Sequence, residues 1–305
     1  MTLALLCPGQ GAQHVGMGKD FYDAFGVAQR VFDQADQVLN FPLTKLCFEG
    51  PEESLNKTDV AQLAIFVTSV AICETLFELG KIAAPAYAAG LSLGEYTALH
   101  LAGVFSFEDG LQLVKARGKL MQAAAEASPS TMVALLGADE ATAAAICEEA
   151  RGGGGEVLVP ANFNTPGQIV ISGAIGACER AAKVAEGKGC RAIPLKVAGA
   201  FHSAFMQPAA DQMAGVLAGI RFSASRLPVI SNVTTQPHGE TESIKQLLVQ
   251  QIVAPVRWYQ SIEALRAKNV SRWVELGPGR TITGMMKKID RKAAMENYST
   301  AEGLA

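Results

Sequence analysis

A serine flanked by glycines occurs in the pentapeptide GLSLG at residues 90–94. The small and apolar residues 83–89 before it predict a buried strand, and residues 95–101 after it have the apolar spacing of a helix. A strand, a sharp turn and a helix form the setting in which a serine hydroxyl is exposed on a strained elbow. The amide after the serine begins the helix without an intrahelical partner, so it can face an oxyanion. The pattern therefore predicts that Ser92 is a nucleophile, and the alternative is a serine that caps an ordinary helix.

A serine nucleophile needs a base within hydrogen-bond reach, most often a histidine, and the chain has 4 histidines. His100 lies two turns into the predicted helix, roughly 12 Å along its axis from Ser92, which is too far to touch the hydroxyl. His238 lies in a QPHG turn and His14 follows a glycine turn, and both patterns are typical of solvated loop residues. His202 lies where a predicted strand gives way to small residues, the place where open α/β sheets carry their sites. The layout favours His202 and leaves the other candidates open.

Composition limits the class of protein. The chain has 305 residues, of which 49% are hydrophobic, and its formal net charge of −3 argues against a nucleic-acid binder. Its 6 cysteines form no C-x-x-C pair, so neither a metal site nor a disulfide framework is predicted. The N-terminal residues lack the positive region of a signal peptide, and no apolar run approaches the roughly 20 residues of a membrane span. We therefore expect a soluble cytoplasmic protein with no membrane partner.

The order of the predicted elements indicates an α/β fold in two domains. Strand, glycine-rich turn and helix occur twice in the first 125 residues, which is typical of an open parallel sheet covered by helices. From about residue 130 the order becomes β-α-β-β-α-β, the ferredoxin-like pattern. We expect a large α/β-hydrolase-like catalytic domain over residues 1–127 and 198–305, with a ferredoxin-like subdomain inserted over residues 128–197.

The individual elements are predicted from periodicity and from turn residues. Strands are expected over residues 3–6, 83–89, 132–136, 157–160, 168–172, 190–197, 228–233 and 273–276. Helices are expected over residues 21–39, 61–79, 95–101, 139–150, 174–186, 204–218, 243–252 and 281–289, with a flexible break over Arg151–Gly155.

Six blocks of sequence resemble the malonyl-CoA:acyl carrier protein transacylase family. They are PGQGAQ at 8–13, GLSLGEY at 90–96, RG at 117–118, ANFNTPGQ at 161–168, GAFHS at 199–203 and ELGPG at 275–279. The blocks follow the order of the family and extend over nearly the whole chain. The resemblance implies transfer of a malonyl group from malonyl-CoA, through a seryl acyl-enzyme, to the phosphopantetheine thiol of an acyl carrier protein. The product would supply fatty-acid or polyketide synthesis, no cofactor or metal is implied, and we expect a monomer.

The resemblance also implies roles for single residues. Ser92 matches the nucleophile and His202 its base. The backbone carbonyl of Gln251 matches the group that orients the imidazole, in place of an aspartate. The backbone N–H groups of Gln10 and Leu93 match the oxyanion hole.

Three further positions bear on the choice of acyl group. Arg117 matches the arginine that holds the malonyl carboxylate, and its planar fork suits bidentate pairing. Acetyl would leave such a guanidinium unpaired, and the alternative for Arg117 is a structural ion pair within its helix. Leu91 departs from the histidine that is common in the family, so malonyl selectivity or turnover is expected to differ. The bulky ring of Phe201 would limit room for a branched α-carbon.

Basic residues form two groups that would suit an acidic carrier protein, although a solvated helix end is the alternative. Near the C-terminus they are Arg280, Lys287, Lys288, Arg291 and Lys292, and in the small subdomain they are Lys183, Lys188 and Arg191. Possible docking residues are Lys188, Arg191, Lys287 and Lys288.

Two other functions compete with acyl transfer to a carrier protein. A serine thioesterase or esterase would use the same elbow and pass the acyl group of an acyl-CoA to water. A non-enzymatic acyl-CoA-binding or carrier-docking module would need Ser92 or His202 to be replaced, and both are present.

Overall fold

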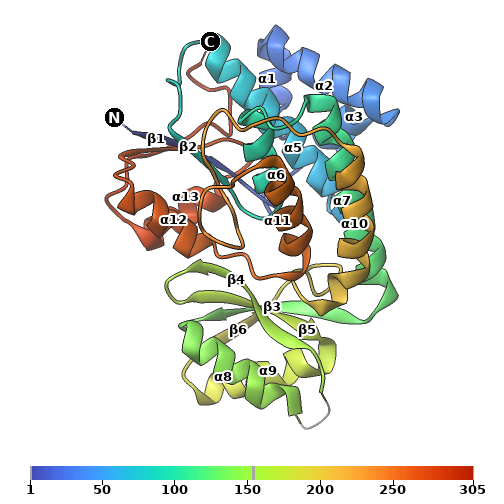
Figure 1. Cartoon of the computed structure of the whole chain (residues 1–305), viewed down its shortest axis with the longest axis vertical. Coiled ribbons are helices and arrows are strands. Elements are labelled where there is room, and N and C mark those ends of the chain that lie inside the picture. Colours follow the sequence, from blue (N-terminus) through green and yellow to red (C-terminus); the bar gives the residue numbers. More distant parts are fainter. Residues whose placement is uncertain (1, 153–154, 305) are drawn as a thin grey trace.

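A five-stranded parallel sheet in the order β7-β2-β1-β8-β9 forms the centre of the larger part of the molecule (Figure 1). Its strands are β1 (Leu3–Cys7), β2 (Tyr87–Gly90), β7 (Val229–Ile230), β8 (Arg272–Glu275) and β9 (Met295–Asn297). The computed structural model describes residues 2–152 and 155–304. Met1, Ala305 and two glycines of the expected flexible break, Gly153 and Gly154, lie outside the described residues.

The central strand β1 is buried on both faces, which explains its unbroken apolar sequence. Leu5 and Cys7 point into a core shared with α2, α5, α6 and α7, whereas Ala4 and Leu6 point into a core shared with α12 and α13. The helices outside the small sheet are therefore divided between the two faces of the parallel sheet. They are α1 (Lys19–Ala24), α2 (Gly26–Leu39), α3 (Leu43–Glu49), α4 (Glu52–Leu55), α5 (Thr58–Glu78), α6 (Leu93–Leu101), α7 (Phe107–Ala127), the 3₁₀ turn η2 (Ala204–Met206), α10 (Gln207–Gly219), α11 (Thr241–Val253), α12 (Trp258–Ala267) and α13 (Thr281–Ile289).

Helix α5 corrects the expectation that no apolar run approaches the length of a membrane span. It has 21 residues, and its most apolar window has a mean hydropathy of 1.9. In the fold 83% of that window is buried, and α2 and α7 are among the helices that pack against it. A helix that is apolar on every side is expected where neighbouring elements of the core cover all of its sides.

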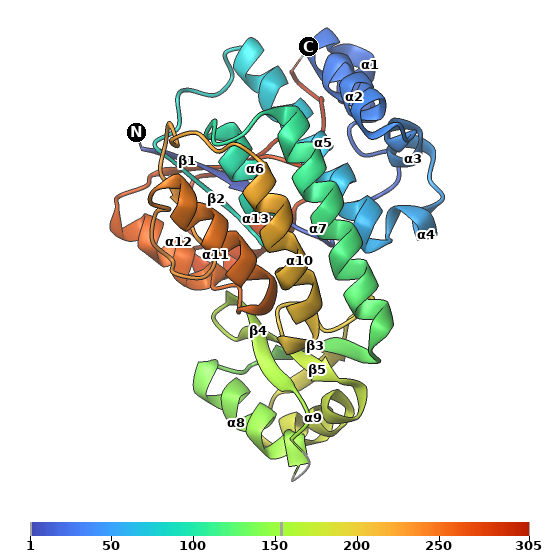
Figure 2. The same ribbon diagram turned by 45° about the vertical axis from the view of Figure 1, so that its right-hand side comes forward.

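Between β3 and β6 the chain forms a small four-stranded antiparallel sheet in the order β4-β5-β3-β6, with two helices on one face (Figures 1 and 2). Its elements are β3 (Ser130–Leu136), α8 (Glu140–Arg151), β4 (Leu158–Thr165), β5 (Gln168–Ala174), α9 (Ile175–Gly187) and β6 (Arg191–Pro194). The two helices and one sheet face share a core of their own. The other face, with Met132 and Val170, belongs to the main core, and Val256 bridges to Asn162 of β4.

Several predicted boundaries need correction. The expected helix over 21–39 is broken at Phe25, whose extended backbone separates α1 from α2. The expected strand over 83–89 pairs only from Tyr87, and the expected strand over 228–233 pairs only at Val229 and Ile230. The sequence pattern assigned no element to α3, α4, α7, α12 or β9.

Two glycines allow the serine elbow to form. A Cβ on Gly94 would lie 2.0 Å from the carbonyl oxygen of Cys7, and one on Gly90 would lie 1.8 Å from the carbonyl carbon of Gly94. Both clashes are with backbone, which cannot swing aside. The start of α6 therefore lies directly against β1 only because these positions have no side chain.

We expect Gly94→Ala to lower the free energy of unfolding by about 3 kcal/mol, because the added methyl forces backbone apart in a packed core. Urea denaturation measures this effect. The matched control is Gly215→Ala at an exposed position of α10, where a Cβ meets nothing within 4 Å, and it should stabilise the fold by about 0.5–1 kcal/mol. Equal effects of the two substitutions would show that the close approach at the elbow is unimportant.

Candidate active site

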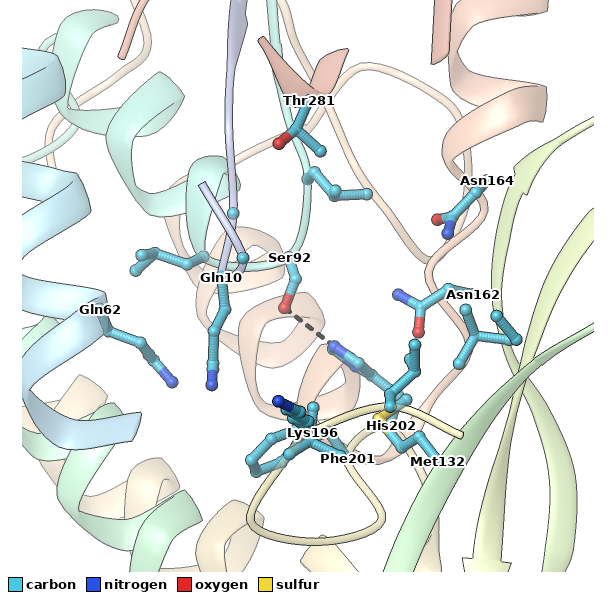
Figure 3. A pocket seen from close by; sticks show the side chains of 18 of the residues that line it. Gln10, Gln62, Ser92, Met132, Asn162, Asn164, Lys196, Phe201, His202 and Thr281 are labelled. Carbon is cyan, nitrogen blue, oxygen red and sulfur yellow. Dashed lines mark hydrogen bonds between the residues drawn. The ribbon is translucent and has the colours of Figure 1, made fainter. Parts of the chain in front are cut away.

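A cavity of ≈ 520 Å³ lies at the carboxyl ends of β1 and β2 and is closed on one side by the small sheet (Figure 3). The β1–α1 turn contributes Gln10, the elbow contributes Ser92 and α7 contributes Arg117. Met132 and Val170 line it from the small sheet. This is the crevice in which open α/β sheets bind their ligands.

The backbone of Ser92 is held in a strained conformation, with φ 51° and ψ −102°. The buried side chain of Asn232, just beyond β7, stabilises it from behind. Asn232 Oδ1 accepts from the Ser92 N–H at 2.7 Å, and Asn232 Nδ2 donates to the Gly90 carbonyl at 2.7 Å. The chain leaves the ladder of β7 early, so Asn232 binds the elbow, which explains why that strand is shorter than predicted.

Ser92 and His202 meet directly, as Figure 3 shows. Ser92 Oγ lies 2.8 Å from His202 Nε2, and His202 Nδ1 lies 2.8 Å from the carbonyl oxygen of Gln251. A carbonyl only accepts, so Nδ1 carries the proton and Nε2 is free to accept from the serine hydroxyl. Burial, and then the cation of Arg117, lower the pKa of His202 to about 4. The imidazole is therefore neutral at pH 7 and able to act as a base.

Arg117 is a buried cation with only 1% of its surface exposed. Nη1 donates to Gln62 Oε1 at 2.7 Å, and Nη2 donates to Ser92 Oγ and to Gln251 Oε1, each at 2.9 Å. The guanidinium carbon lies 5.3 Å from the ring centroid of Tyr96. Among the described residues no carboxylate forms an ion pair with it, so the alternative of a structural ion pair within the helix is wrong. An anion brought next to this guanidinium would offset the cost of burying its charge.

The two residues expected to form an oxyanion hole also line the cavity beside Ser92. Gln10 follows the end of β1, and Leu93 is the first residue of α6. The Leu93 N–H lies in the first helical turn, where no preceding turn supplies a carbonyl. Leu91 and Phe201 line the same cavity and are 8% and 6% exposed.

The remaining histidines lie elsewhere. His100 packs against the rings of Phe66 and Phe107, and His14 is exposed, as expected. The expectation that His238 is solvated is wrong. Its side chain is fully buried, with Nε2 2.6 Å from Glu95 Oε1. The turn around it is at the surface, but the ring folds inward onto α6.

Sequence reasoning missed several residues that line or support the cavity. Gln62, Lys196 and Thr281 line it, and Asn232 supports the elbow. They come from separate elements, so no local motif joins them. The one available signal was Gln62, a polar residue inside the apolar run of α5. No group of His, Cys, Asp or Glu residues within 2–152 and 155–304 could hold a metal ion.

The possible docking residues have different surroundings. Lys288, in the last turn of α13 beside Lys287, donates to Oε1 of the cavity-lining Gln168 at 3.3 Å. Arg191 is exposed at the start of β6. Lys188, just after α9, forms an ion pair of 3.0 Å with Glu149 of α8.

Comparison with known proteins defines the class first. Residues 4–302 match the family model described as an acyl transferase domain, so the chain is an acyltransferase. The malonyl CoA-acyl carrier protein transacylase of Bacillus subtilis is 42% identical over 291 residues, which cover 95% of this chain and 91% of that protein. The protein of that name from Escherichia coli K12 is 42% identical over 287 residues, covering 94% and 92%.

Solved structures agree with the sequence relatives. The malonyl CoA-acyl carrier protein transacylase of Coxiella burnetii superposes with a TM-score of 0.96 at 36% identity, covering 100% of this chain and 96% of that one. A malonyl-transacylase in complex with a type II PKS acyl-carrier protein has a TM-score of 0.96 at 40% identity, covering 100% and 98%. The chain belongs to the malonyl-CoA:acyl carrier protein transacylase family.

We expect acylation of Ser92 by a neutral ester such as p-nitrophenyl acetate to lose rate as pH falls through about 4, because only neutral His202 accepts the serine proton. In Arg117→Gln the nearby cation is gone, so the pKa of His202 rises and the rate is lost at a higher pH. Nitrophenol release against pH measures both profiles, with Ser92→Ala as the blank. An unmoved profile in Arg117→Gln would contradict this electrostatic coupling.

Proposed function

We propose that this chain transfers the malonyl group of malonyl-CoA to the phosphopantetheine thiol of an acyl carrier protein through an acyl-enzyme on Ser92. The observation that carries the proposal is the buried Arg117 guanidinium, 2.9 Å from the Ser92 hydroxyl and without a carboxylate partner among the described residues. A malonyl thioester has its carboxylate two bonds from the carbonyl carbon that the serine attacks. The same short molecule therefore suits both groups.

The first transfer acylates the serine. His202 Nε2 accepts the hydroxyl proton as Ser92 Oγ attacks the thioester carbonyl, and the Gln251 carbonyl holds the imidazole in the required tautomer. The N–H groups of Gln10 and Leu93 receive the oxyanion, where fixed dipoles stabilise it without reorganisation. Protonated His202 then gives its proton to the departing CoA thiolate.

The second transfer reverses the first with a different thiol. The carrier thiol gives its proton to His202 and attacks the malonyl ester. The Ser92 oxygen leaves and takes that proton from His202, which regenerates the serine and the neutral base. In the acyl-enzyme the malonyl carboxylate takes the place of Ser92 Oγ as a hydrogen-bond acceptor for Arg117. No redox or metal step is needed by this chemistry.

Selectivity for the acyl group would come from three residues. Acetyl would leave the Arg117 guanidinium without an anion in a buried site, which costs binding free energy. Phe201 limits the room at the α-carbon. Leu91 packs with Ile230 and Met285, so an apolar wall stands where relatives commonly have a polar side chain.

We also propose that the chain divides into a hydrolase-like catalytic domain over 1–127 and 198–305 and a ferredoxin-like subdomain over 128–197. The strand order of the small sheet and its βαββαβ connectivity support this division. We also propose that the protein acts in the cytoplasm, a reducing compartment that suits its six free, buried cysteines.

Intact mass after brief exposure to malonyl-CoA tests the function. We expect a malonyl adduct on the wild type and none on Ser92→Ala. The adduct should pass to an unloaded holo-carrier, and acetyl-CoA should give a rate lower by about 100-fold, as for loss of a partner to a buried charge. Steady release of CoA without a carrier would favour the thioesterase. No adduct and no release would overturn the assignment.

The docking residues are tested by charge reversal. We expect Lys287→Glu with Lys288→Glu to lower kcat/KM for the carrier about 10-fold while acylation by malonyl-CoA changes less than 2-fold, because charge complementarity acts on protein encounter. Lys188→Glu with Arg191→Glu should have a smaller effect, since Lys188 already pairs with Glu149. Equal loss on both substrates would rule out a docking role.

A further inference from the structure

Glu95 is a buried carboxylate next to the site that the mechanism above does not use. It lies in the first turn of α6, and no part of its surface is exposed. Oε1 lies 2.6 Å from His238 Nε2. Oε2 accepts from Gln251 Nε2 at 2.6 Å and from the Asn232 N–H at 3.2 Å. A charge that is costly to bury is therefore held by three donors from two other segments.

The side-chain amide of Gln251 lies between this carboxylate and Arg117. Its Oε1 accepts from Arg117 Nη2 at 2.9 Å, and its Nε2 donates to Glu95 at 2.6 Å and to the Ser92 carbonyl at 2.9 Å. A guanidinium only donates and a carboxylate only accepts, so the amide has one orientation. The carboxylate thus determines which end of the amide faces Arg117.

The backbone of the same residue orients the base. Gln251 is in the last turn of α11, where carbonyls have no intrahelical partner, and its carbonyl accepts from His202 Nδ1 at 2.8 Å. The contact between Glu95 and the Gln251 side chain therefore ties the end of α11 to the start of α6. A shift of α11 would move the carbonyl away from His202 and the amide away from Arg117 together.

The charge of Glu95 also stabilises the charged form of Arg117. Burial lowers the pKa of Arg117, whereas the neighbouring side chains of Tyr96 and then Glu95 raise it. The Gln251 amide thus separates the negative charge of Glu95 from Arg117, the cation that would bind an acyl carboxylate.

We propose that Glu95 is a positioning residue for acyl transfer, which acts through Gln251 to align His202 and Arg117 on the Ser92 hydroxyl. The proposal rests on the proposed function for its substrate, but the geometry it invokes exists without substrate.

Glu95→Met removes both carboxylate oxygens and the charge in a side chain of similar length, and it is expected to lower the rate of acylation by saturating malonyl-CoA at least 20-fold. Glu95→Asp keeps the charge but withdraws it by one methylene from Gln251, and we expect a loss of at least 10-fold. Glu95→Gln should recover most of the rate, because its oxygen can still accept from Gln251 while His238 changes tautomer. Rapid-quench intact mass measures these rates.

The matched control is Glu275→Met. Glu275 is also fully buried, and it accepts from the N–H groups of Ile282 and Thr283 rather than from the site. It should lower the melting temperature as Glu95→Met does but leave the acylation rate of the folded protein within 3-fold. Acylation in both Glu95→Met and Glu95→Asp within 2-fold of wild type would overturn the positioning role. If Glu95→Met does not fold, Glu95→Asp decides.

A double-mutant cycle tests the route through the amide. In a Gln251→Met background, Glu95→Met should cost less than 3-fold, because the contact it would break is already gone. A full additive loss in the double variant would show that Glu95 acts by another route and would overturn the proposal.

A spectroscopic readout separates this inference from the proposed function. The His202 Nδ1 proton in its 2.8 Å bond to a carbonyl should give a downfield proton resonance. It should be lost in Glu95→Met and kept in Glu275→Met. If the wild type is not acylated, the proposed function fails while the resonance still decides the positioning role. Persistence of the resonance in Glu95→Met would overturn it.

Discussion

A single buried positive charge, that of Arg117, is the constraint on which the site depends. Removing a guanidinium from water is costly unless its donors and its charge are satisfied. Here α5 supplies an amide, the elbow a hydroxyl, α11 a second amide and α6 an aromatic face. Three stretches that are far apart in the sequence, namely α5, the elbow with α6, and α11, must therefore converge on the Arg117 side chain of α7. The same convergence brings the base to the serine.

The sequence predicted best what depends on local pattern. The elbow at Ser92, the strands β1, β3 and β8 and the helices α8, α9 and α13 follow from apolar spacing and from glycine positions, and all are found within a few residues of their expected bounds. His202 was different. Its place after a predicted strand favoured it but left the other histidines open as the base, and the family resemblance singled it out. Local pattern could not do so, because Ser92 and His202 are 110 positions apart in the sequence.

What could not be predicted depends on contacts between distant segments. His238 has the sequence surroundings of a surface turn, yet its ring is buried on Glu95. The strand over 228–233 was overestimated because Asn232 leaves the ladder to bind the elbow. In each case tertiary contacts override a local preference.

The small sheet has a consequence for ligand traffic. One of its faces belongs to the main core, through residues such as Met132 and Val170, and its β4 edge forms a bridge to Val256, which follows α11. Swinging this sheet away would expose apolar surface to water at a cost of about 25 cal/mol per Å². A long thioester arm should therefore reach the cavity while the two sheets stay packed together throughout turnover.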